Sequence, residues 1–178
     1  MSFPQVIFSH GQESGPWGTK ICAMSEMARG LGCDTDSIDY QGIVDPTERV
    51  NKLVDACRAL DGDIILVGSS MGGHVATAAA GPVSAAGLFV LAPAYYMPGF
   101  EALTPDAPDI PIEIVHGWHD DIVPPENSIR FAGECSATLH MVDGDHRLTN
   151  NIDEINYYLE RFINRIASPE SSLDSSRG

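Results

Sequence analysis

The stretch Ile64-Ile65-Leu66-Val67-Gly68-Ser69-Ser70-Met71-Gly72-Gly73 decides the fold of this chain. Its opening apolar run is typical of a strand that is buried on both faces. The small residues of segment 71–80 predict a helix that packs closely on that strand. Between strand and helix lies the pattern G-x-S-x-G, centred on Ser70. The sequence therefore predicts a sharp, strained turn that holds the Ser70 hydroxyl above the end of the strand.

Strand-like and helix-like segments alternate on both sides of this turn. Strands are expected at residues 5–9, 34–40, 63–67, 87–91, 112–116 and 138–142. Helices are expected near residues 21–31, 46–60 and 71–80, after Pro125, and near 152–166, where apolar residues recur at spacings of three and four. Asp45 and Pro46 predict the start of the second helix. This alternation predicts an α/β fold, with a mostly parallel sheet of about six strands covered by helices on both faces.

Length and composition predict one domain. The chain has 178 residues, and its hydrophobic content of 43% is that of a globular protein. We expect residues 1–167 to form the domain and residues 168–178 to form a loose tail, because the tail has few apolar residues. The long connection at residues 92–111 contains five prolines and is expected to have a functional role or to be mobile.

The charge of the chain restricts its partners. A formal net charge of −15 repels phosphate backbones and anionic lipids, so we expect no nucleic acid and no membrane among the partners. No apolar run approaches the ~20 residues of a membrane span. The N-terminus has no basic flank of the kind that begins a signal peptide, which predicts a cytoplasmic protein.

The sequence predicts neither a metal nor a cofactor. Its four cysteines, Cys22, Cys33, Cys57 and Cys135, lie in no C-x-x-C spacing and are expected to be reduced and mostly buried. His116, His119 and Asp120 are possible ligand types, but they do not share one helical face. There is no phosphate-binding glycine motif after the first strand.

A serine hydroxyl is a poor nucleophile without a base, and six histidines are available. His146 lies in the loop after the last strand, which a parallel sheet places at the same edge as Ser70. The base in turn needs an acceptor that fixes its tautomer. The loop after the fifth strand offers two candidates, Asp120 and Asp121. The residues thus predict a serine nucleophile, an acid and a base in the chain order Ser, Asp, His.

Backbone donors for an oxyanion are expected on both sides of Ser70. One is the N–H of Met71, at the start of the helix after the turn. The other is the N–H of Gln12, in the loop after the first strand, where Gly11 permits a close approach of the backbone.

Four motifs together resemble the small, lid-poor serine hydrolases of the α/β-hydrolase superfamily, of the carboxylesterase and thioesterase type. They are the H-G at His10, the G-x-S-x-G at Ser70, the H-G-x-x-D-x-x-V-P at residues 116–124 and the G-D-H that ends at His146. The resemblance implies a catalytic triad of Ser70, Asp120 and His146, with Asp120 rather than Asp121 as the acid. It also implies a minimal α/β-hydrolase fold with strand order 2-1-3-4-5-6, lacking the two leading strands and the cap domain.

The resemblance implies hydrolysis of small carboxylic esters or thioesters through an acyl-enzyme, with a small acyl compound as partner. Aromatic side chains of the surrounding loops are expected to contact that substrate: Trp17, Tyr95, Tyr96 and Trp118. Alternatives on the same triad are an amidase, a peptidase or an acyltransferase. A third possibility is a non-catalytic interaction protein that has kept the fold.

Overall fold

The computed structural model describes residues 2–168. A 6-stranded parallel sheet runs through its centre in the order β2-β1-β3-β4-β5-β6, which confirms the expected order. The strands are β1 (Gln5–Ser9), β2 (Thr35–Ile38), β3 (Ile64–Ser69), β4 (Gly87–Leu91), β5 (Ile112–Gly117) and β6 (Thr138–Val142). The weakly apolar β2 lies at one edge, as expected.

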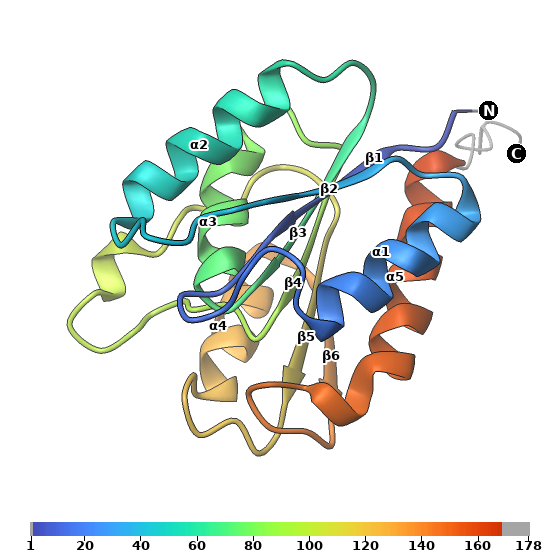
Figure 1. Cartoon of the computed structure of the whole chain (residues 1–178). Coiled ribbons are helices and arrows are strands. Elements are labelled where there is room, and N and C mark those ends of the chain that lie inside the picture. The colour runs from blue at the N-terminus through green and yellow to red at the C-terminus, as the bar shows by residue number, and fades with distance from the viewer. Residues whose placement is uncertain (1, 169–178) are drawn as a thin grey trace, which may run out of the picture.

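Helices cover both faces of the sheet (Figure 1). They are α1 (Thr19–Leu31), α2 (Pro46–Arg58), α3 (Met71–Ala80), α4 (Pro125–Cys135) and α5 (Ile152–Ala167). Helices α1 and α5 pack together on one face, while α2, α3 and α4 lie on the other (Figure 1). Short 3₁₀ turns occupy Glu101–Leu103 and Thr149–Asn151.

Two apolar cores form because alternate residues of each strand point to opposite faces. On β3, Ile64 and Leu66 enter the core beneath α2 and α3, whereas Ile65 and Val67 enter the core beneath α1 and α5. Burying one such side chain contributes about 1.5–3 kcal/mol. This burial on both faces explains why β3 is apolar at consecutive positions. It also fixes the position of β3 in the sheet, and therefore the position of Ser70, which follows the end of the strand.

The local signals at α2 act as the sequence predicts. Asp45 caps the helix, since its Oδ1 accepts a hydrogen bond from the Thr47 N–H (2.8 Å), and Pro46 occupies the first turn. The buried face of α2 contains Leu53, Val54 and Cys57 together with one charged residue, Arg49.

The division into a domain at residues 1–167 and a tail stays a prediction. Helix α5 ends at Ala167, and residues 169–178 of the expected tail lie outside the described residues. The four cysteines are free; Cys33 and Cys57 are buried, Cys135 is half-buried and Cys22 is exposed. Within residues 2–168, no helix combines the length and the apolar character needed to cross a membrane.

Candidate active site

Ser70 lies on a sharp turn between β3 and α3. Its backbone has φ 54° and ψ −120°, outside the helical and extended regions that L-residues favour. The turn is held from both sides: the Ser70 N–H donates to the Leu91 carbonyl of β4 (2.9 Å), and the Ser70 carbonyl accepts from the Ala94 N–H (3.0 Å). These contacts offset the strain of the backbone.

Both glycines of the motif are required by close packing. A Cβ atom on Gly68 would overlap the Gly72 backbone, where the strand turns into the helix. A Cβ atom on Gly72 would overlap the carbonyl oxygen of Ser9, at the end of β1. The sequence therefore places glycine where β1, β3 and α3 touch backbone to backbone, and this contact aims the Ser70 hydroxyl at the sheet edge.

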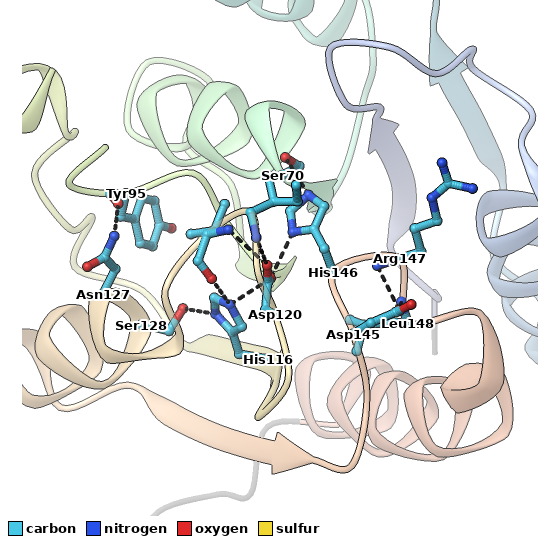
Figure 2. Close-up of polar contacts among 12 residues, drawn as sticks. Ser70, Tyr95, His116, Asp120, Asn127, Ser128, Asp145, His146, Arg147 and Leu148 are labelled. Atoms are coloured by element: carbon cyan, nitrogen blue, oxygen red, sulfur yellow. Dashed lines mark hydrogen bonds and ion pairs between the residues drawn. The ribbon is translucent and has the colours of Figure 1, made fainter. Parts of the chain in front are cut away.

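The structure brings Ser70, His146 and Asp120 together in one hydrogen-bonded chain (Figure 2). The Nε2 atom of His146 lies 3.1 Å from Ser70 Oγ, and its Nδ1 atom lies 2.8 Å from Asp120 Oδ2. Because an ionised carboxylate only accepts, Nδ1 carries the proton. Nε2 then presents its lone pair to the Ser70 hydroxyl, which is the tautomer that a general base requires.

Asp120 is buried and held in its ionised form. Burial raises the pKa of its carboxyl, but hydrogen bonds outweigh that effect and hold the pKa below its usual value. The hydrogen bonds that lower this pKa come from His146 and from the backbone N–H groups of Val123 (2.8 Å) and Ile122 (2.9 Å). The neighbouring Asp121 is exposed and lies outside this network. Of the two carboxylates that the residues left open, the geometry thus brings Asp120 to His146.

Two loops must meet for this chain to form, and a second pair of glycines permits it. A Cβ atom on Gly117, at the end of β5, would overlap the Gly144 carbonyl in the loop that carries His146. The loops also share backbone hydrogen bonds, from the N–H of Trp118 to the Val142 carbonyl (2.9 Å) and from the N–H of His119 to the Gly144 carbonyl (3.0 Å). The acid and the base therefore have a fixed separation.

The predicted oxyanion donors flank Ser70. Met71 is the first residue of α3, and Gly11 lies so close to the serine that a Cβ atom on Gly11 would be 3.6 Å from the Ser70 Cβ. The Gly11 carbonyl accepts from His10 Nδ1 (2.8 Å) and from the guanidinium of Arg49 (3.2 Å). Because the peptide is planar and trans, the Gln12 N–H points the opposite way from that anchored carbonyl.

The four aromatic residues expected at the substrate lie in different surroundings. Tyr95 is fully buried: its hydroxyl bonds to Thr77 and its ring stacks on Phe131. That placement does not fit substrate contact and is explained by the apolar core beneath the 92–111 segment.

The other three aromatic side chains are at least partly exposed. Tyr96 points to α4, where its hydroxyl bonds to Glu134 (2.8 Å) and its ring lies under Arg130. Trp17 lies beside Arg29, which is on the last turn of α1. Trp118 is exposed on the loop next to Asp120.

Two polar residues near the triad are not predicted by the sequence. His116, the residue before the end of β5, contacts Asp120 (3.0 Å). Lys20, on the first turn of α1, extends to the Ser69 hydroxyl (3.4 Å). Burial lowers the pKa of Lys20 to about 8, against the opposing charges of Asp145 and Asp120. The spacing of residues in the sequence gives no signal for either contact.

The described part of the chain contains no group of three or more ligand-type side chains placed to hold a metal ion. Two cavities, of about 450 and 290 Å³, open elsewhere on the surface, beside His140 and beside Tyr96. Neither is lined by Ser70, Asp120 or His146.

Comparisons with known proteins agree with this geometry. The model of the alpha/beta hydrolase family matches residues 6–165. A protein of Xanthomonas campestris pv. campestris, assigned to the alpha/beta hydrolase superfamily, is similar at 31% identity. Its match covers 90% of this chain and 98% of that chain, with a TM-score of 0.83.

Two more distant structures share the fold. Est1E from Butyrivibrio proteoclasticus has 21% identity over 94% of this chain and 89% of its own, with a TM-score of 0.79. Alpha/beta hydrolase domain-containing protein 10 from mouse has 20% identity over 92% and 90%, with a TM-score of 0.75. The comparison with curated protein sequences gives no significant match. With a family match that spans nearly the whole described chain, this protein belongs to the alpha/beta hydrolase family.

Proposed function

We propose that this protein is a serine hydrolase that cleaves small carboxylic esters or thioesters. The observation that supports this most directly is the chain Ser70–His146–Asp120, with spacings of 3.1 and 2.8 Å, on a turn whose backbone is strained at the serine. A binding module gains nothing from a strained serine that faces an imidazole of the right tautomer.

In the proposed mechanism, Ser70 Oγ attacks the carbonyl carbon of the substrate while His146 Nε2 takes the hydroxyl proton. Asp120 stabilises the imidazolium that forms. The N–H groups of Gln12 and Met71 stabilise the developing oxyanion. His146 then gives its proton to the leaving alcohol or thiol, and a water molecule that His146 activates hydrolyses the acyl-enzyme.

The test is covalent labelling of the whole chain by a fluorophosphonate probe, read out by mass spectrometry, together with turnover of p-nitrophenyl acetate. We expect one adduct, on Ser70, and loss of both labelling and turnover in Ser70→Ala. Ser69→Ala is the matched control, since Ser69 is the adjacent hydroxyl and its Oγ faces Lys20. Labelling that persists in Ser70→Ala, or a wild-type chain that is neither labelled nor active, contradicts the proposal.

Parallel assays of matched esters, thioesters and anilides distinguish the reaction types. We expect the ester and the thioester to be cleaved and the anilide to be cleaved far more slowly. Faster cleavage of the anilide would assign an amidase to the same triad.

A further inference from the structure

A second imidazole contacts the acid of the triad. Asp120 Oδ2 lies 2.8 Å from Nδ1 of His146 and 3.0 Å from Nε2 of His116 (Figure 2). The other carboxylate oxygen, Oδ1, accepts the backbone N–H groups of Ile122 and Val123. Four donors therefore converge on one carboxylate, and two of them share a single oxygen atom.

The protonation state of His116 follows from its neighbours. Its Nε2 atom lies 3.0 Å from both Asp120 Oδ2 and the Val123 carbonyl, two groups that only accept, so Nε2 carries a proton. Its Nδ1 atom lies 2.6 Å from Ser128 Oγ on α4, and in a neutral ring that nitrogen accepts the hydroxyl proton. Burial is the main influence on His116 and lowers its pKa, which keeps the ring neutral.

The pair is closed off from water. The side chains of His116 and Asp120 are both 0% exposed, and Ser128 is buried beside them. The charged and titratable groups that face this pair are His146, from the loop after β6, and Lys20, from α1. Helix α4 contributes only the Ser128 hydroxyl. His116 is thus the one side chain besides His146 that hydrogen-bonds to Asp120 within the described residues.

Sharing an oxygen atom has an electrostatic consequence. Asp120 stabilises the imidazolium that His146 becomes when it accepts the Ser70 proton. An N–H donor on the same oxygen withdraws negative charge from it and lowers the energy of the carboxylate, so less of that charge is available to His146. Without His116, Oδ2 would attract the His146 N–H more strongly and would stabilise the imidazolium further.

We propose that His116, fixed by Ser128, is a positioning residue for Asp120 that also limits how strongly Asp120 stabilises the imidazolium of His146. His116 touches neither substrate nor Ser70; it acts through the acid. This role rests on the serine-hydrolase function proposed above. It places a five-residue chain at the site, Ser128–His116–Asp120–His146–Ser70, of which only the last three members take part in the chemistry.

The test is the pH dependence of kcat/KM for p-nitrophenyl acetate from pH 5 to 9, measured on the whole chain. His116→Phe fills the same space without a donor, and we expect the acidic inflection to rise by roughly 0.5–1 pH unit. His116→Gln keeps an N–H donor near the Nε2 position, and we expect its inflection to return toward the wild-type value. A purely structural role would lower stability in both variants without moving the inflection.

A neighbouring imidazole–carboxylate pair provides the matched control. His140 of β6 lies 2.8 Å from Glu113 and stacks on Tyr158, in surroundings that do not include the triad. His140→Phe should leave the inflection in place. If His116→Phe fails to fold, Ser128→Ala removes only the hydroxyl that fixes the His116 tautomer, and a smaller shift in the same direction is expected.

The outcomes separate the two proposals. Full activity in Ser70→Ala contradicts the serine-hydrolase function itself. If Ser70→Ala is inactive but the acidic inflection is unmoved in both His116→Phe and Ser128→Ala, only the role of His116 is wrong. An equal shift in His140→Phe also contradicts it, because the effect would then come from a general change in the sheet.

Discussion

At the scale of single residues, the candidate site depends on which atom of each side chain carries a proton. His146 has one nitrogen on Asp120 and the other on Ser70, so its tautomer is set by its neighbours. His10 is set in the same way, since its Nε2 accepts the Tyr40 N–H and its Nδ1 then donates to the Gly11 carbonyl. Each imidazole is therefore oriented before any substrate arrives, which lowers the reorganisation that the reaction requires.

The acid of the triad gives the first prediction. Asp120→Asn places an amide beside His146 Nδ1 and removes the charge that stabilises the imidazolium. We expect kcat to fall by roughly 10⁴, as in a serine protease with the same change. Steady-state kinetics on p-nitrophenyl acetate measures it, with the exposed Asp121→Asn as the control. A larger loss of kcat in Asp121→Asn would show that Asp121, and not Asp120, is the acid of the triad.

The second prediction concerns Lys20 and the pH dependence of stability. Its pKa is about 8 in the folded chain and about 10.4 in an unfolded one. Between these values the unfolded chain binds more protons, so this group makes the free energy of unfolding rise with pH. Below pH 8 the buried ammonium group of Lys20 is charged, which lowers the free energy of unfolding. Urea unfolding at several pH values should therefore show wild type gaining stability relative to Lys20→Met between pH 8 and 10.

A variant that keeps the charge tests the same cause. Lys20→Arg carries a guanidinium that stays protonated throughout this range, so it should show no such gain. If the free energy of unfolding depends on pH in the same way in wild type and Lys20→Met, the titration of Lys20 does not contribute to stability and the prediction is wrong.

At the scale of elements, glycines determine how closely strands, helices and loops approach one another. Gly72 brings α3 onto the end of β1, and Gly117 brings the loop after β5 onto the loop that carries His146. Gly30, within α1, has nothing within 4 Å of the position of its absent Cβ. Glycine is therefore required for close packing at Gly72 and Gly117, whereas at Gly30 it only adds flexibility to the helix.

The third prediction compares these glycines. Gly72→Ala should lower the free energy of unfolding by about 3 kcal/mol or more, because backbone atoms must shift to admit the methyl group. Gly30→Ala should raise it by about 0.5–1 kcal/mol, since alanine loses less conformational freedom in a helix. Chemical denaturation of both variants measures the difference. A neutral Gly72→Ala would mean that α3 can move away from β1.

Local patterns predict the elements well, and contacts between them poorly. The apolar run before Gly68 and the cap at Asp45 each depend on a few adjacent residues, so the sequence shows them directly. The contacts of His116 and Lys20 with the site depend on which strands and helices become neighbours, and no spacing in the chain encodes that. The burial of Tyr95 is not evident from the sequence for the same reason: only its packing against Phe131 shows that it belongs to the core.

At the scale of the whole molecule, the site lies at the carboxyl edge of the sheet, and within residues 2–168 the connection between β4 and β5 contains only the 3₁₀ turn Glu101–Leu103. The 92–111 segment covers part of this edge, but its Tyr95 is committed to the core and its Tyr96 to α4. The cavity of about 290 Å³ beneath this segment is not lined by the triad. We therefore expect little apolar surface for a long acyl chain beside Ser70.

The last prediction follows from that shape. Each methylene gains roughly 0.8 kcal/mol only while it finds apolar surface to bury. We expect kcat/KM for p-nitrophenyl esters to peak at short chains, about C2 to C6, and then to fall. An acyl-length series from acetate to palmitate measures it. An optimum at palmitate would require the 92–111 segment to open into a tunnel.

The crossing of Gly117 over Gly144 has a consequence for how such a protein can diversify. Two loops that touch backbone to backbone cannot lengthen independently, since an insertion in either would separate Asp120 from His146. Around Gly99, beyond the residues of the 92–111 segment that bond to Ser70 and to the core, a Cβ atom would meet nothing within 4 Å, so no such backbone crossing is present there. An insertion beside Gly99 would therefore leave the separation of Asp120 and His146 unchanged, because the loops that hold the acid and the base would keep their lengths.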